Sequence, residues 1–279
     1  MARTAGALPA PVQAPAAAPL SGGPALLMGG LDSSLVSVGG IETAGAGRSR
    51  TIGQLPVATH DAAAAPAPGG AYFFGGGEPS KDAILRVTAS GHVTAAGKLP
   101  VAASDVAAAE LHGRYYVVGG YTGTQALSTI VEWRPGSKAR VVARTPVALR
   151  YAAVATAGDR IVIAGGSIGV TASRSVYAFD PANRALHRIG RLPRPLTHSS
   201  AATLNGVVYL LGGRGAVQGS QTRRVLAVDP RTGRVRGAGR LPRAISDAGA
   251  AAVPGGILLA GGRDAAGAVR AEVLRLVLR

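Results

Sequence analysis

The chain has 279 residues, a length that can form one large domain, two small ones or a single closed all-β architecture. With 41 glycines, 18 prolines, 47% hydrophobic and only 16% charged residues, the composition excludes disorder and indicates a folded, turn-rich chain. The formal net charge of +16 comes from 30 basic and 14 acidic residues, but the arginines are scattered along the sequence, so we do not expect a nucleic-acid partner.

The sequence contains no cysteine, which excludes a disulfide framework, a thiolate metal site and a thiol nucleophile. Its first twenty residues include one arginine but no continuous apolar segment, and no run of 18 apolar residues occurs. We therefore expect no signal peptide in the printed sequence and no transmembrane segment, and also no metal and no cofactor. The compartment stays open, because an upstream start that supplies a signal segment would make the protein exported or envelope-associated.

A repeat organises the whole chain. Six short apolar runs each end in a glycine pair, and successive pairs are 46, 44, 46, 47 and 49 residues apart: Gly29-Gly30, Gly75-Gly76, Gly119-Gly120, Gly165-Gly166, Gly212-Gly213 and Gly261-Gly262. A Leu-Pro or Thr-Pro step starts 20 residues before five of these pairs and 21 residues before the first: Leu8-Pro9, Leu55-Pro56, Leu99-Pro100, Thr145-Pro146, Leu192-Pro193 and Leu241-Pro242. Two markers in phase six times predict six copies of one structural unit.

Each unit contains four short β segments separated by turn residues, which is the pattern of one propeller blade. In the fourth unit we expect strands over 151–157, 160–164, 174–179 and 185–190. The first segment of a unit is rich in alanine, as at 62–65. Small side chains suit a strand that lies nearest a crowded central axis.

The sixth unit ends after its third strand, and residues 1–8 resemble a fourth one, because RTAGALP at 3–9 aligns with RTIGQLP at 50–56. Pairing of 1–8 with 271–279 would close the ring and remove an exposed sheet edge. We therefore predict an all-β, six-bladed propeller that is closed by an N-terminal strand and forms a single domain over 1–279. Its blades are expected at about 10–53, 57–97, 101–144, 147–190, 194–239 and 243–279 with 1–8.

The glycine pairs, the Leu-Pro steps and the third-strand sequence Tyr177-Ala-Phe-Asp180-Pro181 resemble kelch repeats over essentially the whole chain. The resemblance implies a kelch-type β-propeller whose recognition surface is made by the loops before the first strand and after the second strand of each blade. Family members usually carry a tryptophan in the fourth strand, whereas Trp133 falls in a third strand. Bacterial chains of this Ala- and Arg-rich character are usually named only as kelch repeat-containing proteins.

Both sets of loops converge on one mouth of the central channel. Positions five and six after the first residue of each Leu-Pro or Thr-Pro step, with the residue after each glycine pair, predict a polar ring there. The candidate ligand-binding residues in this ring are His60, Asp61, Asp105, Tyr121, Arg150, Tyr151, His198, Arg214, Asp247 and Arg263. Arginine suits a carboxylate ligand and aspartate suits sugar hydroxyls. Alternatively, the three aspartates hold nearby backbone N–H groups or channel water. We assign no catalytic residue.

Three classes of function fit these features. The preferred one is a monomeric, non-catalytic scaffold that presents loops around the channel to a protein, peptide or glycan ligand. An enzyme is the alternative, because six-bladed kelch sugar mutarotases or epimerases of the sialic-acid type need only acid–base groups around the channel. Copper-radical sugar oxidases share kelch-like propellers but need a cysteine, so we disfavour them. Electrostatic association with nucleic acid or anionic envelope polymers ranks last.

Overall fold

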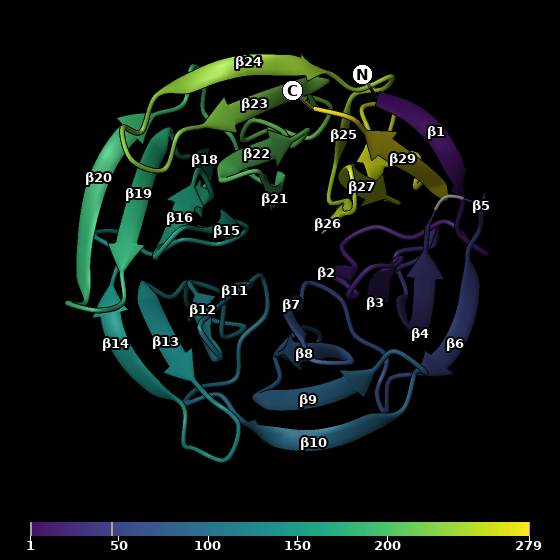
Figure 1. Ribbon diagram of the computed structural model, residues 1–279, viewed down its shortest axis with the longest axis horizontal. Helices are drawn as coiled ribbons and strands as arrows, with labels where there is room; N and C mark the ends of the chain where they lie inside the picture. Colours follow the sequence, from purple (N-terminus) through teal and green to yellow (C-terminus); the bar gives the residue numbers. More distant parts are fainter. Residues whose placement is uncertain (1, 46, 279) are drawn as a thin grey trace.

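The computed structural model describes residues 2–45 and 47–278, which form strands, turns and loops without a helix. Within this part of the chain, six sheets of four or five strands stand around a central axis (Figure 1). The predicted all-β, six-bladed propeller is thereby confirmed. No helix of the described residues is long and apolar enough to cross a membrane.

Blades one to five are four-stranded meanders that run from the axis outward. Blade one consists of β2 (Ala16–Pro19), β3 (Ala25–Leu31), β4 (Ser37–Ala44) and β6 (Arg50–Gln54). Blade two consists of β7 (Ala63–Ala67), β8 (Gly70–Phe74), β9 (Ala83–Thr88) and β10 (Val93–Lys98). Blade three consists of β11 (Ala107–Leu111), β12 (Arg114–Val118), β13 (Thr129–Trp133) and β14 (Arg140–Arg144).

The remaining blades follow the same plan, with short extra strands in their loops. Blade four consists of β15 (Ala153–Ala157), β16 (Arg160–Ala164), β19 (Ser175–Asp180) and β20 (Ala185–Arg191), with a small hairpin of β17 (Ser167–Ile168) and β18 (Thr171–Ala172). Blade five consists of β21 (Ser200–Leu204), β22 (Val207–Leu211), β23 (Arg224–Val228) and β24 (Val235–Arg240). Blade six contains β26 (Gly249–Val253), β27 (Gly256–Ala260) and β29 (Glu272–Leu276), with a short pair of β25 (Ile245–Ser246) and β28 (Arg263–Asp264).

The outer strand of blade six comes from the other end of the chain. Strand β1 (Ala2–Ala7) pairs antiparallel with β29 in a register that runs from Ala2 opposite Leu276 to Ala7 opposite Glu272. Figure 1 shows this purple strand beside the yellow C-terminal strand. The short β5 (Gly47–Arg48) then pairs with the outer side of β1. The predicted closure is confirmed, and β29 has a partner on both sides.

Small side chains pack the innermost strands, which are β2, β7, β11, β15, β21 and β26 in Figure 1. Ala18 and Ala65 on the first two are almost completely buried. Larger apolar side chains fill the space between neighbouring blades farther out. Trp133 packs there between blades two and three, with its ring centroid 4.8 Å from Tyr72 and 5.6 Å from Tyr115. A third-strand tryptophan thus fills an inter-blade core.

The glycine pairs join each blade to the next one. In every pair the first glycine has a φ of 61° to 68° and the second a φ of 91° to 119°, a region that a Cβ disfavours. The N–H of the second glycine donates to a carbonyl oxygen of the following blade over 2.7 to 2.9 Å, and Gly262 closes the circle by donating to Val12 of blade one. A Cβ on the first glycine would lie only 2.2 to 2.3 Å from that same oxygen.

The Leu-Pro steps anchor the loops between blades. The leading residue of each step is buried, including Thr145, which replaces leucine in blade four and donates its hydroxyl hydrogen to Ser128 and Val147 carbonyls at 3.1 and 2.7 Å. In all six steps its backbone N–H donates at 2.7 Å to a carbonyl at the start of the third strand of the same blade, which lies just before that strand in five blades and within β4, at Gly39, in blade one. The glycine pairs therefore join neighbouring blades, whereas the Leu-Pro and Thr-Pro steps hold the end of each fourth strand to the third strand of the same blade.

Four of the strand ends expected in blade four are wrong, three of them by one residue in β19 and β20 and one by two residues in β15. We expected a strand from 151 to 157, but β15 begins at Ala153 because Tyr151 has a left-handed φ of 53°. An extended strand cannot include this conformation, so the strand starts two residues later.

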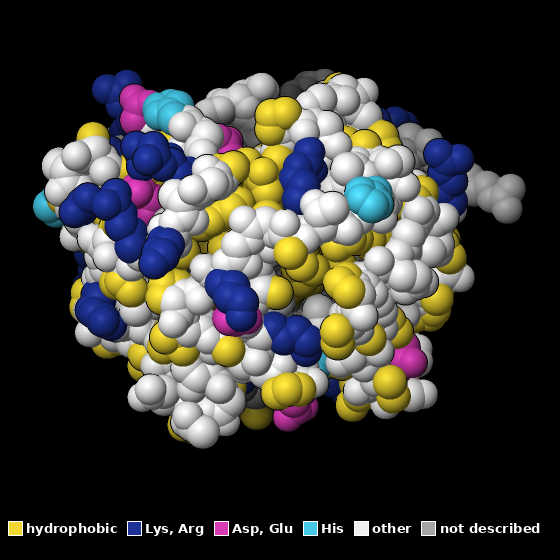
Figure 2. Space-filling view, turned by 90° about the horizontal axis from the view of Figure 1, so that it is seen from below, with side chains coloured by type: hydrophobic (Ala, Val, Ile, Leu, Met, Phe, Trp, Pro, Cys, Tyr) yellow, Lys and Arg dark blue, Asp and Glu magenta, His cyan; other side chains and the backbone are white. Residues whose placement is uncertain are grey.

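Basic side chains are dispersed on the edge of the propeller that Figure 2 shows, where acidic and apolar side chains lie between them. This arrangement agrees with the scatter of arginines along the sequence.

Candidate functional site

Six equivalent residues, one from each blade, surround the channel axis at one end of the propeller. They stand six positions after the first residue of each Leu-Pro or Thr-Pro step, and we call them the axial ring: Ala14, Asp61, Asp105, Tyr151, His198 and Asp247. All six have a left-handed φ between 52° and 58°. The N–H of each donates to the carbonyl of the ring residue in the preceding blade, over 2.7 to 3.3 Å, in a closed circle of six hydrogen bonds. The backbone of the ring is therefore fixed by its own hydrogen bonds.

A second row of residues, the mouth row, lies around the axial ring. The residue before each axial residue forms a β-bridge with the residue after a glycine pair: Gln13 with Leu31, His60 with Gly77, Ser104 with Tyr121, Arg150 with Ser167, Thr197 with Arg214, and Ser246 with Arg263. The structure thus brings the two predicted loop sets side by side in every blade. All ten candidate residues lie in these two rows, and blade one contributes Ala14 and Leu31 in place of charged groups.

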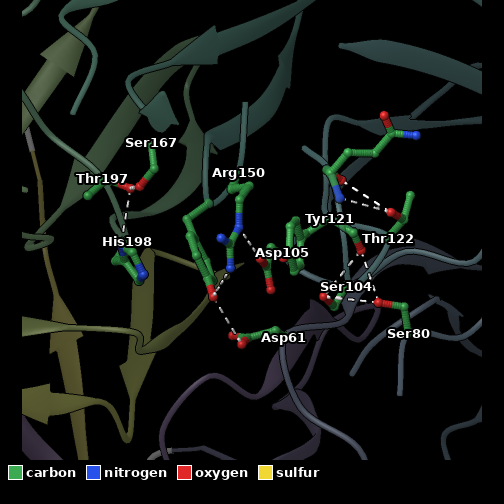
Figure 3. Close-up of polar contacts among 12 residues, drawn as sticks. Asp61, Ser80, Ser104, Asp105, Tyr121, Thr122, Arg150, Ser167, Thr197 and His198 are labelled. Atoms are coloured by element: carbon green, nitrogen blue, oxygen red, sulfur yellow. Dashed lines mark hydrogen bonds and ion pairs between the residues drawn. The ribbon is translucent and has the colours of Figure 1, made fainter. Parts of the chain in front are cut away.

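Arg150 is the centre of one half of the mouth (Figure 3). Its Nε donates to Asp105 Oδ2 at 2.5 Å, and its Nη2 donates to the Tyr151 hydroxyl at 3.4 Å. The guanidinium carbon lies 4.1 Å from the centroid of the Tyr121 ring. The Asp105 side chain is only 3% exposed, whereas Arg150 is 31% exposed. A buried carboxylate and a tyrosine ring therefore hold a guanidinium that still reaches solvent.

Asp61 continues this network toward the axis. The Tyr151 hydroxyl donates to Asp61 Oδ2 at 3.4 Å. Burial, together with the nearby Asp105 and Asp247 carboxylates, raises the pKa of Asp61 well above its usual range. Burial also raises the pKa of Tyr151, so its hydroxyl keeps its proton and remains a donor.

His198 occupies the opposite half of the mouth as a neutral base with both nitrogens engaged. Arg214 Nη2 lies 3.0 Å from its Nε2, and the Thr197 hydroxyl lies 3.0 Å from its Nδ1. Because arginine can only donate, Nε2 must accept, which places the proton on Nδ1. Burial and the positive charges of Arg214 and Arg150 lower the pKa of His198 to about 2. The Tyr151 ring stacks on the imidazole with the centroids 3.8 Å apart.

Asp247, in blade six, lies beside Ser246 and His198. Its Oδ2 accepts from the Ser246 hydroxyl at 2.6 Å, and its Oδ1 lies 3.9 Å from His198 Nε2. Burial raises the pKa of Asp247 to about 6, although Ser246, Arg214 and Arg263 oppose the rise. Arg263 acts on Asp247 through its charge, since its Nε donates to the Gly267 carbonyl. Within the described residues, the carboxyl groups of the three axial aspartates accept hydrogen bonds from side chains rather than from backbone N–H groups.

Some residues at the mouth carry no signal in the repeat. The Ser37 hydroxyl lies 2.8 Å from His60 Nδ1, although Ser37 belongs to the third strand of blade one. The Gln221 amide donates to the Ser246 hydroxyl at 3.4 Å from the loop before β23. Loops after the glycine pairs differ in length between blades, so spacing could not align these two positions. Burial lowers the pKa of His60, which is 15% exposed.

At the level of the axial ring the channel holds a cavity of about 110 Å³, and a second cavity of about 270 Å³ lies between the innermost strands of all six blades. Liquid water occupies about 30 Å³ per molecule, so the axial cavity has room for a few waters. A larger ligand that arrives from this end would have to rest on the mouth row. Among the described residues, no group of three or more His, Cys, Asp or Glu side chains is arranged to hold a metal ion.

Comparisons with known proteins agree with this architecture. A family model described as the kelch motif matches residues 148–185, which span most of blade four. A kelch domain-containing protein of Pyrococcus furiosus is 39% identical over 89 residues, which cover 31% of this chain and only 28% of that protein. The solved structure of YjhT superposes with a TM-score of 0.81 over 96% of this chain and 95% of YjhT, at 15% sequence identity.

The fold and the two rows at the mouth define a closed β-propeller with a polar, concave end. Its repeated glycine pairs and its matches identify the chain as a kelch-repeat β-propeller. At this coarse level it is a scaffold that presents loops around a channel.

Proposed function

We propose that the protein is a binding module that recognises a glycan at the channel mouth and catalyses no reaction on it. The observation that carries this proposal is the guanidinium of Arg150, which Asp105, Tyr121 and Tyr151 hold in place while it stays 31% exposed. A group that is already fixed loses little conformational freedom when a ligand arrives. It also offers donors in the fork that carboxylate and hydroxyl oxygens accept.

The groups around Arg150 suit a sugar. The Tyr121 ring offers an apolar face beside the guanidinium, and the Asp61 carboxyl offers oxygens to hydroxyl groups. Arg214 and Arg263 add positive charge on the other side of the mouth, which favours a sugar that carries a carboxylate. The small axial cavity supports binding on the mouth row for a ligand that arrives from this end of the channel.

Sugar mutarotation is the second candidate function, and one observation favours it. The pKa of Asp247 is raised to about 6, so this carboxyl is suited to proton transfer near neutral pH, and burial also raises the pKa of the neighbouring Asp61. His198 does not fit that role, because its pKa of about 2 makes it a very weak proton acceptor.

A thermal-unfolding screen against free sugars, sialic acids and short anionic glycans tests the proposal. A ligand at 100 times its Kd adds about 2.7 kcal/mol to the free energy of unfolding, which raises the Tm by several degrees. Arg150→Ala alone would leave Asp105 buried without its partner, so the test variant is Arg150→Gln with Asp105→Asn, which removes both charges together. We expect the ligand-induced shift to disappear in this variant.

The matched control is Lys98→Gln with Asp82→Asn, which neutralises an exposed ion pair of 3.1 Å on the outer part of blade two. Its ligand-induced shift should equal that of the wild type. No shift with any sugar, or an equal loss of shift in the control, would overturn the glycan proposal. Faster anomer interconversion of the bound sugar, measured by NMR, would replace it with mutarotation.

A further inference from the structure

A groove of about 720 Å³ lies on blade five, outside the axial ring. One wall is the loop that enters the blade, with Pro193, Pro195 and Leu196, and another is the loop from Arg214 to Thr222 between β22 and β23. Leu226 on β23 lies between these walls. The groove therefore has an apolar floor between two loops of the channel-mouth face.

Five arginines line this groove, and no aspartate or glutamate does: Arg194, Arg214, Arg223, Arg224 and Arg240. Every ion pair of the described residues involves other side chains, so none of the five has a carboxylate oxygen within 4.0 Å. Arg194, Arg224 and Arg240 are exposed. Unpaired cations gathered over one concavity create a positive potential that attracts an anionic partner.

The fold does not require this charge. The corresponding groove of blade one, about 350 Å³, is lined by Asp32 and Glu42 and by no basic residue. That of blade three is lined by no charged residue and measures only about 40 Å³. Three blades with the same strand plan thus have an acidic, an uncharged and a basic groove. The arginines of blade five are a property of that blade and not of the repeat.

Two polar atoms at the inner end of the blade-five groove also lack a partner. Arg214 Nε and Gln221 Oε1 are buried, and neither has a hydrogen bond within the described residues. A buried polar group without a partner is costly, and a bound polar chain or water would relieve the cost.

We propose that this groove binds an extended acidic peptide segment of a partner protein. Glutamate or aspartate side chains would pair with Arg194, Arg224 and Arg240, and small apolar side chains between them would contact Pro195 and Leu196. Single-stranded nucleic acid fits less well, because the groove lining contains no aromatic side chain on which bases could stack. A sulfated glycan would leave the apolar floor unused. The proposal does not depend on the glycan site at the mouth.

The test measures binding of a fluorescently labelled ten-residue peptide, in which glutamate alternates with alanine or leucine, to the whole protein by anisotropy. Arg224→Glu and Arg240→Glu reverse the charge of two groove arginines. Each should weaken binding at least about tenfold, which corresponds to about 1.4 kcal/mol, and added salt should weaken wild-type binding. Neither side chain makes a hydrogen bond or ion pair among the described residues, so we expect both variants to fold.

The control is Arg236→Glu, which makes the same charge change at an exposed position of β24 outside the groove. It should leave peptide binding within about twofold of the wild type. An equal loss in this control, or no binding of the peptide, would overturn the proposal. Tighter binding of a heparin fragment or of a ten-nucleotide DNA strand than of the peptide would also overturn it. The Arg150→Gln, Asp105→Asn variant should keep peptide binding, so failure at the mouth and failure at the groove are distinguishable.

Discussion

Two circles of residues surround the channel, only two positions apart in each blade, and the fold constrains them in different ways. The first circle consists of the residues four positions after the first residue of each Leu-Pro or Thr-Pro step. Their carbonyl oxygens accept hydrogen bonds from the second glycine of each pair, and all six residues are buried: Val12, Thr59, Ala103, Leu149, Leu196 and Ile245. The axial ring two positions later keeps one backbone conformation in six blades with four different residue types: Ala, Asp, Tyr and His.

The difference shows how a repeat can carry a site. Backbone groups alone make the contacts of the first circle, and backbone groups alone close the hydrogen-bonded circle of the axial ring. The axial side chains are therefore free to differ without loss of the frame. We expect substitutions in the frame to cost stability, and substitutions at the mouth to change protonation and binding instead.

Removal of residues 1–8 should have the largest effect on the frame. The deletion takes away β1, exposes the edge of β29 and removes the buried Leu8. We expect the Tm to fall by more than about 10 °C, measured by circular dichroism. Arg3→Ser, which changes an exposed side chain of β1 but keeps the strand, should leave the Tm nearly unchanged. An unchanged melting curve after the deletion would show that the ring does not depend on this closure.

Gly119→Ala tests one blade-to-blade contact. Its Cβ would lie 2.2 Å from the Leu149 carbonyl oxygen, at a φ of 63°. We expect a loss of at least about 4 kcal/mol in the free energy of unfolding, measured by urea denaturation. Gly113→Ala is the matched control, because Gly113 has a φ of 74° but no atom within 4 Å of the added Cβ. The free energy of unfolding of the control should fall by only about 1 kcal/mol, because alanine there is strained by the left-handed backbone conformation but clashes with no neighbour. Equal losses would mean that the close approach is unimportant.

His198→Gln should have the smallest effect, and it should depend on pH. The histidine pKa falls from 6.5 to about 2 on folding, so its neutral form contributes stability that is complete above pH 6.5 and is lost as the pH falls toward 2. At pH 4.5 the protonation of the unfolded chain should cost the wild type about 2 to 3 kcal/mol relative to pH 7.5. Glutamine can accept from Arg214 and donate to Thr197, and it does not titrate, so this loss should be absent in the variant.

The same measurement distinguishes the pH dependence due to His198 from that due to the axial carboxyl groups. The raised pKa of Asp247 and Asp61 acts in the opposite direction, because their contribution is present at low pH and is lost as the pH rises through the folded pKa, about 6 for Asp247. Both proteins retain these groups, so the difference between them reports His198. His187→Gln, at an exposed position of β20, is the control and should follow the wild type. Parallel pH curves for the wild type and His198→Gln would contradict the neutral, buried imidazole.

The repeat was sufficient to predict the frame, because its contacts are local in each blade and occur six times. The recurring glycine pairs predicted positions that cannot accommodate a Cβ. The pattern RTxGxLP, shared by 3–9 and 50–56, predicted that the N-terminal segment forms a fourth strand. The positions of the ten candidate residues around the mouth also followed from counting along the repeat. Counting could not find Ser37 or Gln221, since their loops have no common length.

The sequence by itself determined the number of blades, the closure of the ring and the two rows at the mouth, because these depend on backbone geometry that recurs at a fixed spacing. Only the tertiary structure decided how the side chains of those rows are paired and protonated. Asp105 and Asp247 occupy equivalent positions, yet one pairs with Arg150 and the other stays near Ser246 and His198. Such pairings depend on which neighbours the ring brings together from different blades, and no single repeat contains that information.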